Sequence, residues 1–195
     1  RPPRSTLFPY TTLFRSDTII IHNGADDNAS GTAGILELSY KLMSNRHLLK
    51  RSVLFVCFDA EEKGLLGSKY YVENPVRNIS NAAMMVNMDM IGRLNDNPVI
   101  LEGVGSSGNF ENIIADARNN HTLDVETNMG GMDFGRSDHA SFYRENIPVL
   151  FFFTGAHEDY HKPTDDWDKI DYQGEKEILD FIYDLIIDKI GRAHV

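Results

Sequence analysis

The sequence predicts a three-layer αβα fold with a largely parallel central sheet. Short apolar runs typical of buried strands alternate along the chain with segments whose apolar residues recur at helical spacing. The 195 residues are enough for one domain with a substantial core and too few for two ordinary ones. We therefore expect a single domain, residues 17–190, with helices on both faces of the sheet.

The two ends of the chain, residues 1–16 and 191–195, match neither the acidity nor the periodicity of the rest. Both resemble translated sequencing-adapter or cloning sequence, so we expect a non-native leader and a non-native tail. The start has no pattern of a signal peptide, and no apolar run approaches the roughly 20 residues that span a bilayer. Neither end enters the functional argument.

Composition excludes several classes of partner. The 29 acidic and 19 basic residues give a net charge of −10, which argues against nucleic acid or an anionic membrane as the main partner. The single cysteine, Cys57, rules out a disulfide framework within the chain and a thiolate metal cluster. Its apolar neighbours predict a buried small apolar residue.

The first half of the chain begins with a β-branched run, 17–21, which is either an edge strand or the approach to a turn. Helix 31–45 follows, capped by Ser30 or Asn28, with an apolar stripe made of Ile35, Leu38, Leu42, Leu36, Tyr40 and Met43. The continuous apolar run 52–58 predicts a central strand covered on both faces. A helix at 64–74, ended by Pro75, and a strand at 82–88 complete this half.

The second half repeats the alternation. Strands are expected at 98–103 and 147–153, and helices at 107–119, 137–145 and 172–190. The glycine-rich stretch 127–136 and the polar stretch 154–169 predict loops.

Acidic residues and histidines follow the ends of three apolar runs, at 59–62, at Asp89 and at 157–161. A glycine-flanked turn, 23–31, adds Asp26 and Asp27 just before a helix. In open α/β sheets, ligands bind beyond the carboxyl ends of the strands, at a switch in strand order. We therefore expect these side chains at one rim of the sheet.

Each of these features also has a plainer interpretation. A turn rich in Asp, Asn, Ser and Gly is usually only a helix cap, and Glu61 and Glu62 can be a solvated acidic helix start. Their recurrence favours a cation, because clustered carboxylates repel one another unless a cation offsets the charge. Mixed Asp, Glu and His ligation suits Zn²⁺, and a bridging carboxylate suits two ions about 3.5–4 Å apart.

At these residues the chain resembles the co-catalytic zinc aminopeptidases, which include bacterial leucyl aminopeptidases, aminopeptidase Y and the catalytic domain of glutamate carboxypeptidase relatives. The resemblance runs from about residue 17 to 190 and rests on five motifs in the family's order: GADDNASG at 24–31, FDAEEKGLLGS at 58–68, NMDMIG at 87–92, SDHASF at 137–142 and DYHKPTD at 159–165. It implies the zinc-exopeptidase fold, a peptide substrate and hydrolysis of the N-terminal peptide bond. It also implies a secreted or periplasmic protein.

The resemblance implies a role for each matching residue. Asp26 is expected to bridge two zinc ions, with a cis Asp26–Asp27 peptide bond. Glu62 and His161 would complete one zinc site, and Asp89 would bind the other ion. Glu61 is expected to be the general base, and Tyr160 to donate a hydrogen bond to the oxyanion. Asp27, Asp138 and His139 are expected to orient ligands or line the pocket.

One element of the family pattern is absent. The family supplies a histidine of the second zinc site from an upstream His-x-Asp strand end, so we expect the domain to lack its N-terminal strands. His22 is the only upstream histidine and thus the candidate replacement, although relatives usually carry a non-ligand there. Two zinc ions are expected in an intact family member, and one or none here if no residue replaces that ligand.

Three functions remain open from the sequence. The leading hypothesis is an aminopeptidase in which Glu61 activates a zinc-bound bridging water. A glutaminyl cyclase-like enzyme would use one zinc, and a catalytically inactive scaffold or fragment would lack the missing histidine ligand. The sequence specifies neither the oligomeric state nor the side-chain preference.

Overall fold

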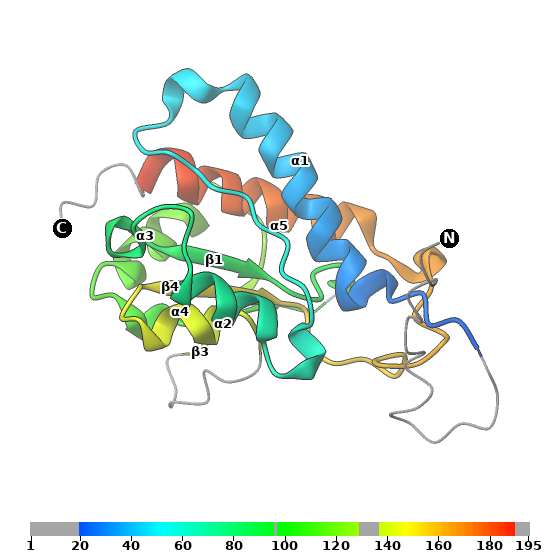
Figure 1. Ribbon diagram of the computed structural model, residues 1–195. Coiled ribbons are helices and arrows are strands. Elements are labelled where there is room, and N and C mark those ends of the chain that lie inside the picture. The colour runs from blue at the N-terminus through cyan, green and yellow to red at the C-terminus, as the bar shows by residue number, and fades with distance from the viewer. Residues whose placement is uncertain (1–19, 96, 129–136, 190–195) are drawn as a thin grey trace.

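The structure is a computed structural model that describes residues 20–95, 97–128 and 137–189. A four-stranded sheet lies at its centre, and helices cover both faces (Figure 1). The strands are β1 (Met85–Met88), β2 (Val99–Glu102), β3 (Val125–Asn128) and β4 (Val149–Phe153), in the order β1-β4-β2-β3. β1 pairs with β4 and β2 with β3 in parallel, whereas β2 and β4 are antiparallel. The predicted α/β class with a mixed sheet is confirmed.

Five helices form the two outer layers. One layer contains α1 (Gly31–Ser44), α3 (Phe110–Arg118) and α5 (Tyr172–Asp184), which continues as a π-helical turn, Leu185–Lys189. The other contains α2 (Leu66–Glu73) and α4 (His139–Arg144), which contact each other below the sheet in Figure 1. Single 3-10 turns lie at Arg46–Leu48, Glu61–Lys63, Ile79–Asn81, Val104–Ser106 and Trp167–Lys169. No helix among the described residues is long and apolar enough to cross a membrane.

β4 divides the core into two clusters, because its successive side chains point to opposite faces of the sheet. Leu150 and Phe152 join the larger cluster, which lies under α1, α3 and α5. Val149 joins the smaller cluster, with Phe142 and Ile147. Each fully buried side chain of this size contributes roughly 1.5–3 kcal/mol. The strand that the sequence predicted at 147–153 is confirmed, and the structure shows that it is buried on both faces.

The segment 52–58 differs from its prediction. It is extended and runs beside the sheet from the end of α1 to the Glu61–Lys63 turn (Figure 1), but it is not a strand. Its backbone has no hydrogen bond to another residue in the described part of the chain. Leu54, Phe55 and Cys57 are exposed, so the prediction that Cys57 is buried is wrong. An apolar run predicts the tendency to pair, and a strand forms only where a partner strand is available.

The apolar stripe of α1 is narrower than predicted. Leu38 and Leu42 are buried, whereas Leu36, Tyr40 and Met43 are exposed. The helix approaches α5 at Gly34, where an added Cβ would lie 2.9 Å from Leu179 Cδ2. Close packing on this side leaves the opposite side of the helix uncovered by the described residues.

Two further predictions differ at the sheet edges. Residues 20 and 21, the described end of the run 17–21, belong to no regular structure. β3 was not predicted, although Val125 and Thr127 alternate with the charged or polar residues 124, 126 and 128 as in an edge strand. Residues 129–136 of the predicted loop lie outside the described residues.

Candidate metal centre and active site

The glycine-flanked turn is tied to the end of β1 by Asn28. Its Oδ1 accepts hydrogen bonds from the backbone N–H groups of Gly31 (3.1 Å) and Met90 (3.2 Å), and its Nδ2 donates to the Met88 carbonyl (3.0 Å). Of the two predicted caps, Asn28 is the one whose side chain caps α1, because Ser30 makes no capping bond. The cis peptide bond joins Asp27 to Asn28, one residue later than predicted.

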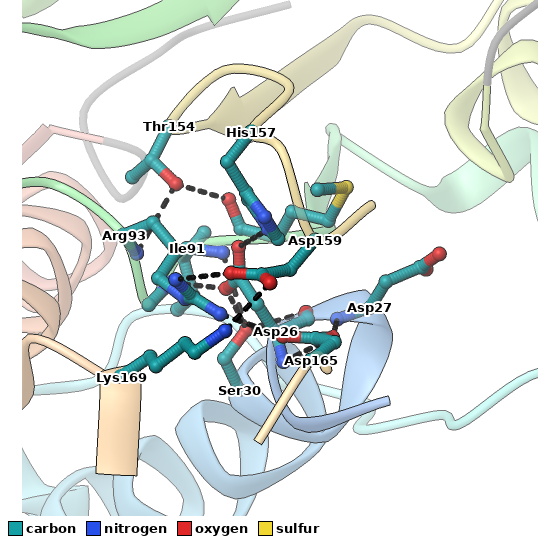
Figure 2. Close-up of polar contacts among 12 residues, drawn as sticks. Asp26, Asp27, Ser30, Ile91, Arg93, Thr154, His157, Asp159, Asp165 and Lys169 are labelled. Atoms are coloured by element: carbon teal, nitrogen blue, oxygen red, sulfur yellow. Dashed lines mark hydrogen bonds and ion pairs between the residues drawn. The ribbon is translucent and has the colours of Figure 1, made fainter. Parts of the chain in front are cut away.

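Asp26 is fully buried, and both of its carboxylate oxygens have protein partners (Figure 2). Oδ1 accepts from Gly92 N (2.7 Å) and from Ser30 Oγ (2.9 Å), and Oδ2 lies 3.1 Å from His157 Nε2. Burial raises the pKa of Asp26, although the bonds from Gly92 and Ser30 oppose the shift. The contacts of this carboxylate therefore hold the turn against the segment that follows β1 and against the 157–165 loop.

Asp27 lies where Asp26 was predicted to lie, beside Glu62 and His161. Its Oδ2 is 3.1 Å from His161 Nε2, which is 3.0 Å from Glu62 Oε1. Among the described residues, these three form the one group of potential ligands whose atoms all lie within 4.8 Å of one another. The structure thus brings Asp27, which was expected at the pocket wall, and not Asp26 into this group of potential ligands.

Asp27 and Glu62 of this group line a pocket of about 400 Å³. Four acidic residues line it together with apolar side chains and a tyrosine, the full set being Asp27, Glu61, Glu62, Gly64, Leu65, Asp89, Met90, Phe151, Phe153, Ala156 and Tyr160. Burial first, and then the charges of Glu62 and Asp89, raise the pKa of Asp27 to about 7. Burial and the charges of Asp89 and Glu62 raise the pKa of Glu61 to about 8. Crowded carboxylates with such raised pKa values are the electrostatic signature of a site suited to a cation.

Asp89 lines the same pocket but is held by a separate network. Ser137 Oγ donates to Asp89 Oδ2 (2.6 Å), and Asn87 Nδ2 donates to Ser137 Oγ (2.8 Å). Burial raises the pKa of Asp89, while the bond from Ser137 opposes the shift. In the described part of the chain Asp89 belongs to no group of three potential ligands, and neither does His22.

Tyr160 borders the pocket next to His161. The two rings stack with centroids 3.8 Å apart, and 42% of the tyrosine remains exposed. Burial and the neighbouring charges of Asp27 and Glu62 raise the pKa of Tyr160 to about 12. The phenol therefore keeps its proton at neutral pH and can donate a hydrogen bond into the pocket.

Asp138 and His139 lie behind the pocket wall and do not line the pocket. The fully buried His139 ring stacks on Phe151, which does line it, with centroids 4.4 Å apart. Burial lowers the pKa of His139 to about 4 and raises the pKa of Asp138. His139 is thus a neutral support for Phe151 at physiological pH.

The sequence assigned no role to three residues that organise this rim, namely Arg93, His157 and Asp165, although His157 lies in the expected 157–161 group. Arg93 pairs with Asp165 (3.0 Å) and Asp159 (3.3 Å), and His157 faces Asp26. Asp159 and Asp165 are the first and last residues of the motif that contains His161, so their place in the motif could have indicated a role. Arg93 follows the NMDMIG motif directly and carried no separate signal.

The donor set fits zinc. Asp27, Glu62 and His161 offer two carboxylates and an imidazole, which are groups that zinc binds, and three protein ligands would leave a fourth position open, as at catalytic zinc sites. A divalent cation would also offset the repulsion that raises the pKa of Asp27.

Comparison with known proteins supports this interpretation. Leucine aminopeptidase 2 of Trichophyton equinum is 32% identical over 148 residues, which are 72% of this chain and 30% of that protein. Leupeptin-inactivating enzyme 1 of Streptomyces exfoliatus is 35% identical over 168 residues, which are 82% of this chain and 34% of that protein. The chain therefore spans about a third of the length of the curated relatives that it matches.

Solved structures agree with the sequence relatives. The LapA aminopeptidase of Legionella pneumophila superposes with a TM-score of 0.75 at 25% identity, over 89% of this chain and 48% of that one. The aminopeptidase of Aneurinibacillus sp. strain AM-1 gives 0.68 at 28% identity, over 85% and 39%. Residues 16–186 match the sequence profile of peptidase family M28. With the motifs, the fold and the relatives in agreement, the chain belongs to peptidase family M28.

Proposed function

We propose that this chain carries the catalytic centre of a zinc aminopeptidase, an exopeptidase that removes the N-terminal residue of a peptide. The observation that carries the proposal is the meeting of Asp27, Glu62 and His161, because Asp27 and Glu62 line the same pocket as Glu61. Membership of a peptidase family and similarity to aminopeptidases support the same activity.

In this proposal Asp27, Glu62 and His161 would hold a zinc ion, and Asp89, which lines the same pocket, would be available to a second one. Bound zinc would act as a Lewis acid toward the scissile carbonyl and lower the pKa of a coordinated water. The Ser137 bond to Asp89 would fix the orientation of that carboxylate.

Glu61 is the proposed general base. Its carboxyl group lines the pocket beside Asp27 and Glu62, yet it does not belong to the group of three potential ligands. It would take a proton from the attacking water and deliver it to the leaving amine. Burial and the charges of Asp89 and Glu62 raise its pKa in the metal-free chain, and a bound cation would lower it toward the range of a base.

Tyr160 is proposed to donate its phenolic hydrogen to the oxyanion that develops on the scissile carbonyl. Its place at the pocket edge and its pKa of about 12 both support a protonated donor. The stack on His161 would hold the ring beside the metal ligands.

A Glu61→Gln variant tests the proposal. The zinc-loaded chain should release the chromogen from an aminoacyl p-nitroanilide, and Glu61→Gln should lower kcat by about 10²–10⁴-fold because the proton transfer is lost. Glu62→Gln is the matched control, because it is the same substitution at the adjacent residue. Zinc content should be unchanged in Glu61→Gln and reduced in Glu62→Gln. Full activity after chelation, or in Glu61→Gln, would refute the proposal.

A further inference from the structure

Asp165 is the buried partner of the turn that carries Asp27. Its carboxylate is 2% exposed, and one oxygen, Oδ2, accepts hydrogen bonds from the backbone N–H groups of Asp26 (2.9 Å) and Asp27 (3.0 Å). Its own backbone carbonyl accepts from Ala25 N (3.1 Å). Three consecutive N–H groups of the turn therefore bind this single residue. Figure 2 shows Asp165 beside Asp26 and Asp27.

Arg93 holds Asp165 from the other side. Its Nη2 donates to Asp165 Oδ1 (3.0 Å), its Nη1 donates to Asp159 Oδ2 (3.3 Å), and its side chain is 10% exposed. Its backbone N–H donates to Thr154 Oγ1 (3.3 Å). Arg93 comes four residues after Asp89, so this one side chain joins the segment after β1 to the 159–165 loop.

Along the chain, His161 lies between Asp159 and Asp165, whose carboxylates both pair with Arg93. Its backbone φ is 57°, a left-handed conformation that costs a non-glycine residue roughly 1–3 kcal/mol and persists only where the surroundings fix it. The contacts of Arg93 to Asp159 and Asp165 restrain the loop on both sides of His161. Asp165 thus links the turn that presents Asp27 to the loop that presents His161.

We infer that Asp165 is a positioning residue: by holding the Asp27 peptide N–H, it sets the place of the Asp27 carboxylate relative to His161 and thereby the affinity for zinc. The inference rests on the proposed function, because it needs Asp27 to be a zinc ligand. Asp165 acts through the main chain of Asp27 and is not itself a member of the ligand group.

A double-mutant cycle on the full chain separates positioning from a general structural role. Zinc affinity is measured by competition with a chromogenic chelator in the unaltered chain, Asp165→Asn, Asp27→Asn and the double variant. Asp165→Asn should weaken zinc binding by about 10–100-fold when Asp27 is present, as loss of an outer partner of a ligand typically does. In the Asp27→Asn background its effect should be at least several-fold smaller, because the carboxylate that it positions is gone.

Asp166→Asn is the matched control. It is the same substitution one residue later, and the Asp166 carboxylate accepts from the side chain of Asn23, at the start of the turn, and not from the backbone N–H groups of Asp26 and Asp27. Its zinc affinity should stay within about twofold of the unaltered chain. If Asp165→Asn does not fold, Asp165→Glu replaces it in the cycle, since it keeps the charge opposite Arg93 but displaces the oxygen that accepts the two N–H groups.

The outcomes test the positioning role of Asp165 and the proposed function separately. An equal loss of affinity in both backgrounds, or no loss when Asp27 is present, would overturn the positioning role. Unchanged affinity in Asp27→Asn itself would instead remove Asp27 from the metal site and with it the proposed function. If Asp27→Asn binds zinc too weakly to measure, the visible bands of the Co²⁺-loaded chain decide: they should shift in Asp165→Asn, and unshifted bands would overturn the inference.

Discussion

Two of the segments that bring potential metal ligands together are held in very different ways. The turn around Asp27 is fixed by backbone and side-chain hydrogen bonds to Asp165, to the end of β1 and to His157. The segment 52–58, which leads to Glu62, has no backbone hydrogen bond to another described residue and exposes Leu54. One side of the candidate metal centre is clamped, and the other follows an unpaired extended segment.

The difference shows what holds a site in place. Polar residues within the short motifs can satisfy one another as soon as the motifs meet, so the turn and the 159–165 loop form a self-contained unit. An apolar strand instead needs a neighbouring backbone along its whole length. Among the described residues, the 52–58 segment has no such neighbouring backbone.

The strongest way to break the clamped side is Arg93→Met. This change leaves the buried Asp165 carboxylate without its cation, and such losses cost about 3–5 kcal/mol. Urea unfolding of the metal-free chain measures it. Lys169→Met is the control, because its more exposed pair with Asp159 should contribute less than about 1 kcal/mol. Similar losses in the two variants would contradict a special role for the buried pair.

Asn28→Ala tests the connection between the turn and β1. It removes the acceptor for two backbone N–H groups and the donor to the Met88 carbonyl, at a cost of about 2–3 kcal/mol. The same urea measurement applies, with Asn78→Ala as the control at an exposed Asn that caps a 3-10 turn. A loss no greater than that of the control would show that the turn is held without Asn28.

Glu175→Gln should change the free energy of unfolding by a smaller amount that depends on pH. Burial and the nearby Asp26 raise the pKa of Glu175 to about 7 from an ordinary 4.5. Between these pH values the folded state retains a proton that the unfolded state has lost, so stability falls as pH rises through this window. Glu175→Gln removes this dependence and should be more stable than the unaltered chain by about 1–2 kcal/mol at pH 8, with little difference at pH 4. Thermal unfolding at the two pH values checks this, and an equal difference at both would contradict it.

Leu54→Lys should have the smallest effect on stability. Leu54 is 56% exposed on the unpaired segment, so the free energy of unfolding should change by less than about 0.5 kcal/mol. Self-association, measured by sedimentation velocity, should decrease because a charge interrupts an exposed apolar strand-like surface. A loss of several kcal/mol would show that Leu54 is buried in solution and would remove the contrast between the two segments.

Most elements were predictable because their signals are local. The continuous apolar run predicted β4, and the helical spacing of Ile178, Ile182 and Leu185 predicted α5, both of which the structure confirms. The run at 52–58 carried an equally strong signal, yet it forms no strand because pairing depends on residues far from it in sequence. The same limit applies to α1, whose exposed Tyr40 could not be told from a buried one by spacing alone.

The sequence alone determined the family motifs, their order and the gathering of acids and a histidine at one rim of the sheet. Which of two adjacent aspartates would face the pocket was decided only by the tertiary structure. Asp26 is drawn inward by Gly92 and His157, which are 66 and 131 residues away along the chain, and this leaves Asp27 beside Glu62 and His161. Neighbouring residues in a turn point in different directions, so the choice depends on partners that only folding brings together.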